Sequence, residues 1–299
     1  MLNHFRITQL TAGCVVVLFV LAAVWMTERP ATSQIVNAPA RADAARDLFL
    51  QGVTMQRDFY QALIAANRVA LYRDEAYAQE VQAIMASIKK NYGEMGRQIT
   101  HPEPKQQFEE VMKWFDQFAV ANEKWWQTEV ERKKAATEQL QSMAQARDSI
   151  NILTHLIAEV ISEHFSITQN GETYFRADRV ALKDGVSNLT IYIRDIRRMN
   201  LEYSFVFDDR SKKTIRENFA KTYEHITADI KAMEPHFVTE KGRVGFHELN
   251  RNLTAWWAAL NKEMELVDRL AKIDVETATI AGEAMDKMSK MLAAFESQR

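Results

Sequence analysis

The sequence predicts an all-helical fold, in which an N-terminal membrane-spanning helix precedes a six-helix region that forms two stacked four-helix bundles. Helix breakers are rare, with nine glycines and five prolines in 299 residues. Two long stretches lack proline: 105–170, which also lacks glycine, and 246–299, whose only glycine is Gly282. No run of apolar and polar residues alternates strictly between turn residues, so we expect no strands.

The long uninterrupted stretches also bear on function. A continuous helix over 105–170 would be about 100 Å long. A compact catalytic core does not need a rod of this length. Two long return helices are built to span distance, so the pattern favours a sensor or a scaffold over an enzyme.

Composition and motifs narrow the chemistry further. The formal net charge is −2, from 38 basic and 40 acidic residues, whereas a nucleic-acid-binding protein usually has a strongly basic face. Cys14 is the only cysteine, which excludes a disulfide framework. Phosphate loops and nucleophile elbows are absent. We therefore expect no enzyme, cofactor or nucleic-acid partner. A metal on His155, Glu159 and Glu163 is a weaker alternative to a solvated helix face.

An apolar segment near the N-terminus predicts a membrane anchor. Residues 7–26 carry no charge over twenty positions, which matches a hydrocarbon core of ~30 Å. Arg6 precedes this segment, so we expect 1–6 in the cytoplasm and the rest of the chain exported. A cleaved signal peptide is the alternative. Residues 27–40 form a linker interrupted by Pro30 and Pro39.

Turn residues divide 41–299 into six helical segments. The first two together are about as long as the third, and the next two about as long as the sixth, so each half is expected to be a broken helix followed by a continuous return helix. The predicted membrane-near bundle comprises 41–73, 134–207 and 268–299, and the membrane-far bundle comprises 74–133 and 208–267.

The two halves show a repeat at a spacing of 133 residues. In the first segment, positions expected to face the bundle interior are Arg46, Phe49, Val53, Gln56, Tyr60, Leu63, Asn67 and Ala70. The equivalent positions in the fourth segment are Arg179, Leu182, Val186, Leu189, Ile193, Ile196, Asn200 and Tyr203. We expect Asn67 and Asn200 to fix the register of the bundles, as buried polar residues do at helix seams.

This organisation resembles the helical bimodular ligand-binding domain of bacterial chemotaxis receptors and some sensor kinases. The resemblance covers 41–299 and rests on the anchor, the paired broken helices and the two long helices. It implies a periplasmic domain on the cytoplasmic membrane, a homodimer, and a small di- or tricarboxylate-like organic acid as ligand. It also implies a second membrane span that the chain does not contain before Arg299. The chain is therefore expected to be the exported part of a longer receptor, and a free-standing anchored protein that has lost its output is the alternative.

Two arginines are the main candidates for binding a carboxylate. Arg46 and Arg179 occupy interior positions where apolar residues are usual, and a charge facing a bundle interior requires a partner or a ligand. The planar guanidinium matches the geometry of a carboxylate. We expect the two to hold an acid between facing helices, and a local acidic partner for each is the alternative.

Further candidates lie beside these seams. Arg57 and Tyr60 could reach inward from the first segment, Thr154 and His164 from the third, and Thr277 from the sixth. Each could donate a hydrogen bond to a ligand oxygen. The more common interpretation of any one of them is a core polar group whose hydrogen bonds are satisfied within the protein. Two other functions stay open: the sensor part of a histidine kinase, and an anchored scaffold that binds proteins.

Overall fold

The computed structural model describes residues 39–164, 172–206, 208–237 and 239–297, and side-chain surroundings for 43–158 and for the described residues from 182 onward. Every regular element among them is helical, which confirms the all-helical class. The elements are α2 (Pro39–Tyr72), α3 (Glu75–Tyr92), α4 (Met95–Gln98), α5 (Pro102–His164), α6 (Glu172–Phe205), α7 (Asp209–Met233), the 3₁₀ turn η1 (Glu234–His236) and α8 (Glu240–Glu296).

Local side-chain bonds set where the helices begin. The carboxylates of Asp74 and Asp208 accept hydrogen bonds from the backbone N–H groups of Ala76 and Ser211. These bonds satisfy amides that have no partner in the first helical turn. Pro102 opens α5, where its missing N–H costs no helical bond. The long helices α5 and α8 therefore closely follow the two breaker-poor stretches of the sequence.

The connection between α2 and α3 reverses the chain. Arg73 has a φ of 54°, in the left-handed region, and its amide donates to the carbonyl of Val69 at 2.8 Å. A residue in this conformation ends a right-handed helix, and Asp74 then starts the next. The expectation that these two segments continue in one direction is therefore wrong, because they form a hairpin with a two-residue connection.

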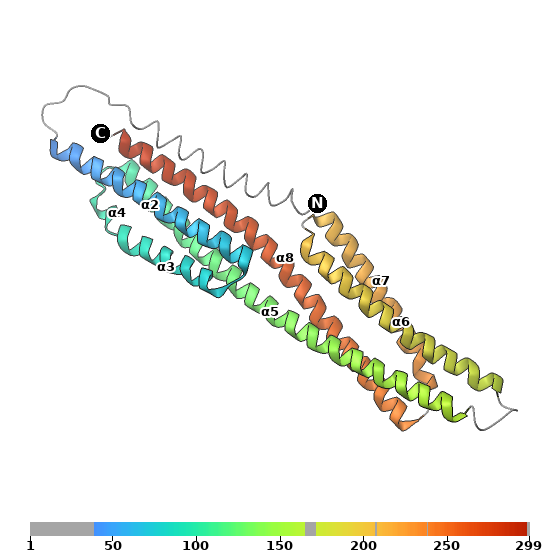
Figure 1. Cartoon of the computed structure of the whole chain (residues 1–299). Coiled ribbons are helices and arrows are strands. Elements are labelled where there is room, and N and C mark those ends of the chain that lie inside the picture. Colours follow the sequence, from blue (N-terminus) through green and yellow to red (C-terminus); the bar gives the residue numbers. More distant parts are fainter. Residues whose placement is uncertain (1–38, 165–171, 207, 238, 298–299) are drawn as a thin grey trace.

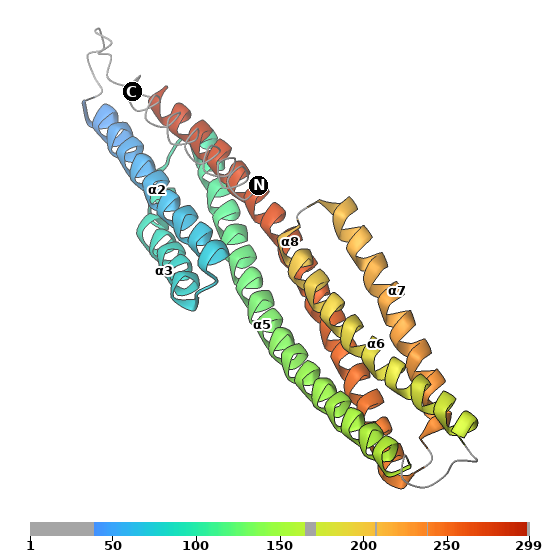
Figure 2. The same ribbon diagram turned by 45° about the vertical axis from the view of Figure 1, so that its right-hand side comes forward.

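Two such hairpins flank one long antiparallel pair. Helices α5 and α8 run side by side along the whole molecule (Figure 1). The α2–α3 hairpin packs at one end of this pair, and the α6–α7 hairpin packs at the other. Figures 1 and 2 place the hairpins on opposite sides of the pair, with the start of α2 and the end of α8 at the same end of the molecule.

Each end of the pair has its own hydrophobic core. The first bundle is built on buried residues within 55–125 and 270–295, and the second on buried residues within 146–264. This grouping corrects the predicted one, in which 134–207 lay beside 41–73. Short connections keep consecutive helices adjacent, so α3 stays with α2 and α6 stays with α7.

Aromatic side chains fill both cores. In the first bundle Phe59 is fully buried; its ring stacks on Phe115 with centroids 4.3 Å apart and meets Phe118 edge-on at 5.1 Å. In the second bundle Trp256 is fully buried. Burying one large apolar side chain contributes about 1.5–3 kcal/mol, so these residues are major sources of stability.

The interior register is as predicted in α6 and shifted by one residue in α2. In α6 the interior residues include Leu182, Val186, Leu189, Ile196 and Tyr203. In α2 they are Met55, Phe59, Ala62, Ala65 and Val69. The cap residues Asp74 and Asp208 lie 134 residues apart, as do Ala62 and Ile196. The repeat is therefore real at the level of burial, with a spacing one residue longer than expected.

The shift separates the two asparagines that were expected to be equivalent. Asn67 lies on the surface of α2, whereas Asn200 is half-buried and its amide donates to Glu263 at 3.4 Å. Only Asn200 can therefore help to fix the register between helices.

None of the helices in the described part of the chain is both long enough and apolar enough to cross a membrane. The predicted anchor, 7–26, lies outside the described residues.

Candidate functional site

The arginines expected to clamp an acid do not meet. Arg46 is exposed on α2 in the first bundle. Arg179 belongs to the part of α6 whose side chains are not described, and α6 packs at the other end of the α5–α8 pair from α2 (Figure 1). Within one chain these two residues therefore do not form a clamp. Arg57 is also exposed and pairs with Asp58 at 3.1 Å, while Tyr60 is half-buried and burial raises its pKa.

The other candidates are dispersed as well. Thr154 is exposed, and its hydroxyl donates to the carbonyl of Ile150 within the same helix at 2.8 Å. The side chain of His164 lies outside the described part. Thr277 is half-buried, and its hydroxyl oxygen is buried with no hydrogen-bond partner. Among the predicted site residues whose side chains are described, Thr277 is the one with a buried polar atom that lacks a hydrogen-bond partner.

A cluster of buried charges lies where the hairpin turns meet the middle of the α5–α8 pair, a region that we call the waist. Arg132 of α5 donates two hydrogen bonds of 2.8 Å to Glu129, whose side chain has no solvent exposure. The same guanidinium lies 3.5 Å from the carboxylate of Glu263 on α8. Arg73 of the α2–α3 turn approaches Glu129 at 3.4 Å. Side chains from both bundles therefore converge on one ion cluster.

The negative charges of Glu129 and Glu263 are compensated unequally within this cluster. Glu129 receives two short charge-assisted bonds and the charge of Arg73. Glu263 has only the 3.5 Å contact with Arg132 and the 3.4 Å bond from Asn200. Burial and the neighbouring charge of Glu129 raise the pKa of Glu263 above its ordinary value, and they outweigh the opposing effects of Asn200 and Arg132.

A second charged group ties the α6–α7 hairpin to α8. The Asp268 carboxylate accepts hydrogen bonds from Tyr203 at 2.7 Å, Lys212 at 3.1 Å and Arg216 at 2.5 Å. Burial alone would raise the pKa of Asp268, but these donors reverse the effect and lower it. This carboxylate is fully compensated, so it acts as a structural anchor for the end of α6.

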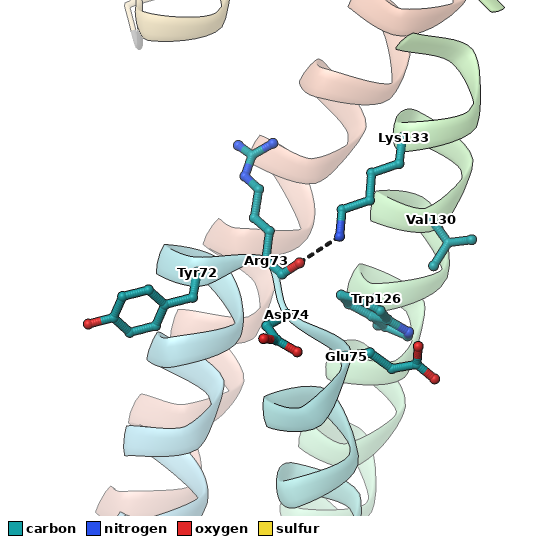
Figure 3. A pocket seen from close by; sticks show the side chains of 7 residues that line it. All are labelled: Tyr72, Arg73, Asp74, Glu75, Trp126, Val130 and Lys133. Atoms are coloured by element: carbon teal, nitrogen blue, oxygen red, sulfur yellow. Dashed lines mark hydrogen bonds between the residues drawn. The ribbon is translucent and has the colours of Figure 1, made fainter. Parts of the chain in front are cut away.

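A cleft of about 400 Å³ opens between the α2–α3 turn and α5. In Figure 3 the ammonium of Lys133 reaches the turn, where it donates to the carbonyl of Arg73 at 2.6 Å. The ammonium also lies over the Trp126 ring, 5.1 Å from its centroid. The lining residues are Tyr72, Arg73, Asp74, Glu75, Trp126, Val130 and Lys133.

The cleft is lined by two cations, Arg73 and Lys133, and two carboxylates, Asp74 and Glu75. Asp74 is occupied in capping α3, and Glu75 accepts a bond from Gln79 at 3.1 Å. An ammonium has three donors, and Lys133 uses one of them on Arg73. The first turn of α3 contributes the positive end of a helix dipole. Asp74 and Glu75 already offset that helix end, so Lys133 is the group of the cleft that could bind a carboxylate, whose carbon skeleton would rest on Trp126.

A third polar group lies beside the turn, on α5 and α8. Trp125 is buried, and its indole N–H lacks a partner of good geometry although it lies near enough to Asp274 to lower that group's pKa. Desolvation of the Asp274 carboxylate nevertheless raises its pKa to about 6, even though the residue as a whole is exposed. The charge of Arg73 opposes this rise, so the turn also influences Asp274.

The sequence analysis did not single out Glu129, Arg132, Glu263 or Lys133. In a helix rich in charged residues these positions resemble solvated side chains. The one available signal was their register. Glu129 and Glu263 lie on the interior faces of α5 and α8, in line with the buried residues Phe118 and Trp256.

Comparison with known proteins gives no relative: no protein-family model matches the chain, and no curated protein matches it. Among the described residues there is also no group of histidine, cysteine or acidic side chains arranged to hold a metal ion. Function therefore has to be argued from the geometry.

Proposed function

We propose that this chain is the extracytoplasmic sensor domain of a bacterial chemotaxis receptor, which binds a small organic acid and transmits a helix displacement towards the membrane. Residues 7–26 would anchor it, and the first bundle would lie nearest the bilayer. In this proposal the domain belongs to the helical bimodular type, and it catalyses no reaction.

One observation carries the proposal. Helix α8 is continuous over 57 residues, joins both cores, and ends beside the start of α2. A displacement anywhere along such a rod reaches its end, because packed helices shift as rigid units between discrete arrangements. The arrangement suits signal transmission along the long axis, and the protein needs no moving loop for it.

The cleft at the waist is our proposed ligand site, in place of the arginine clamp. Its volume of about 400 Å³ is suitable for a small metabolite. Lys133 would bind a carboxylate, and Trp126 would contact the carbon skeleton. Because Arg73 lines the same cleft and also pairs with buried Glu129, a ligand that moves the turn would disturb the contact between the first bundle and the α5–α8 pair.

Substituting Lys133 by alanine should weaken acid binding about tenfold or more, because it removes a charge-assisted hydrogen bond. Isothermal titration calorimetry with the full-length chain and a panel of mono-, di- and tricarboxylic acids would measure the effect. Lys134→Ala is the matched control, since Lys134 is the exposed neighbour on α5 and does not line the cleft.

The titration separates the two parts of the proposal. Absence of binding to every acid in the panel would reject the acid sensor. Binding that is equally strong in wild type and Lys133→Ala would place the ligand elsewhere in the molecule.

We further propose that the sensor is a homodimer formed through the outer face of α2. Leu50, Arg57, Ile64 and Leu71 follow one another at intervals of seven residues, and the apolar three are 51%, 45% and 65% exposed. A seven-residue repeat is the signature of helix-to-helix pairing, and a single charged residue within it can select a dimer. Arg46 and Tyr60, first expected to bind ligand, lie near this face.

Ile64→Glu is therefore expected to weaken dimerisation at least tenfold, because it buries a second charge in each copy of the seam. Analytical ultracentrifugation of the full-length chain would measure the change. Val275→Glu provides the control, as Val275 is 69% exposed on α8. A wild-type chain that stays monomeric, or a dimer that Ile64→Glu leaves intact, would contradict this interface.

Two other functions would account for the same fold. A histidine-kinase output would keep the sensor and change only the segment that follows it. A scaffold that binds proteins is favoured by exposed apolar residues on α6, where Leu201 and Phe205 are 58% and 70% exposed. The acid panel decides between the sensor and the scaffold.

A further inference from the structure

The carboxylate of Glu263 is the least compensated charge at the waist. It is buried on α8, and its two polar contacts, with Arg132 and Asn200, are 3.5 and 3.4 Å long. Arg132 directs both of its short bonds to Glu129 instead. One guanidinium therefore serves two buried carboxylates and satisfies only one of them, which leaves Glu263 as the group where a proton would relieve the cluster.

We infer that the waist cluster is a proton-linked switch, in which the Glu263 carboxylate binds a proton from solvent and thereby changes how α5 and α6 hold α8. In the deprotonated state the two carboxylates compete for Arg132. In the protonated state Arg132 forms an ion pair with Glu129 alone, and the Glu263 carboxyl becomes a neutral hydrogen-bonding group beside Asn200. This inference is independent of the ligand proposed above.

The charged and polar groups that face Glu263 determine how readily its carboxylate binds a proton. Arg132 and Glu129 act on it from α5, and Asn200 acts from α6. The cations of α7, Lys212 and Arg216, are engaged with Asp268.

The direction of the pH dependence follows from the raised pKa of Glu263. Between its ordinary pKa and this raised value, the folded chain binds more protons than the unfolded chain. The free energy of unfolding should therefore fall as pH rises through that range, and the ionised carboxylate should reduce stability at neutral pH. Asp274, with a pKa of about 6, contributes a slope of the same sign.

Glu263→Gln tests the switch, because glutamine keeps the shape and removes the charge. The full-length chain would be compared with and without this substitution in an Asp274→Asn background, which removes the second contribution. We expect the variant to melt about 2–4 °C higher at neutral pH, with a smaller decrease of the melting temperature between pH 4 and pH 7. Glu265→Gln, an exposed neighbour on α8, should retain the parent profile.

A direct titration keeps the inference testable if a variant does not fold. Carbon-13 NMR of wild type with labelled glutamate carboxyl groups should show one glutamate that titrates above the ordinary range. Hydrogen exchange in the last turns of α6 should change over the same pH interval, since Asn200 lies there. A lower melting temperature for Glu263→Gln with an unchanged pH profile, or no glutamate with a raised midpoint, would overturn the switch.

Discussion

Replacing Arg132 by glutamine is expected to lower the free energy of unfolding by about 3–5 kcal/mol, the usual cost of stranding a buried charge. Arg132 is the cation shared by Glu129 and Glu263, and both carboxylates are buried. Glutamine offers only neutral N–H donors in place of the charged guanidinium. Of these two carboxylates, the remaining cation, Arg73, approaches Glu129, at 3.4 Å, so it cannot compensate for the loss.

Urea denaturation would measure this effect, with Arg269→Gln as the control. Arg269 also joins the two long helices, through Glu131 at 3.3 Å, but both partners are more than half exposed. Exposed pairs contribute about 0–1 kcal/mol. The cost of Arg132→Gln should also shrink as the pH falls, because stranded carboxylates bind protons and lose their charge. Equal effects of the two substitutions would show that burial at the waist is unimportant.

The helical class and the two long rods could be predicted because they depend on local chemistry. A stretch with few or no glycines and prolines has little local reason to end, and α5 and α8 accordingly occupy most of the two breaker-poor stretches. The direction of α3 is a different matter. Asp74 is a typical N-cap residue, so the sequence indicates that a new helix begins there. The reversal of the chain depends instead on the left-handed conformation of Arg73, which a non-glycine residue rarely adopts.

The register error in α2 has a physical origin. The true interior face carries small residues, Gly52, Ala62 and Ala65, which let helices approach closely; a Cβ atom on Gly52 would collide with Leu292. The predicted positions, one residue further along, carry larger apolar residues, Phe49, Val53 and Leu63, which are half-buried. Periodicity alone therefore offers two competing seams. In α6 the interior face holds the larger residues, and the same reasoning gives the correct register.

The sequence did not predict the candidate site, and the register error in α2 is part of the reason. A carboxylic acid site was sought at arginines in apparent interior positions, and the shifted register places Arg46 outside. The charges that are buried belong to the middle of α5 and α8, where two antiparallel helices and two hairpin ends meet. Such a junction depends on contacts between residues that lie 56, 65 and 131 positions apart, which no local pattern reports.

The second large effect is expected for Phe59→Ala, which should cost about 3–5 kcal/mol. Phe59 is fully buried, and its ring contacts both Phe115 and Phe118. Alanine would lose the transfer free energy of the ring, both aromatic contacts, and the packing around the cavity that remains. Phe205→Ala is the control, because Phe205 is 70% exposed and a surface substitution usually changes stability by no more than about 0.5 kcal/mol.

The place where Phe59→Ala acts also tests whether the two cores are independent. Phe59 belongs to the first cluster, whereas Trp256 and its neighbours belong to the second. If the α2–α3 hairpin opens first, hydrogen exchange should accelerate in α2 and α3 at denaturant concentrations that leave α6 and α7 protected. Simultaneous loss of protection in both hairpins would mean that the shared α5–α8 pair couples the bundles into one cooperative unit. If α8 transmits a signal between the two bundles, the bundles have to be coupled in this way. The measurement therefore tests transmission through α8 directly.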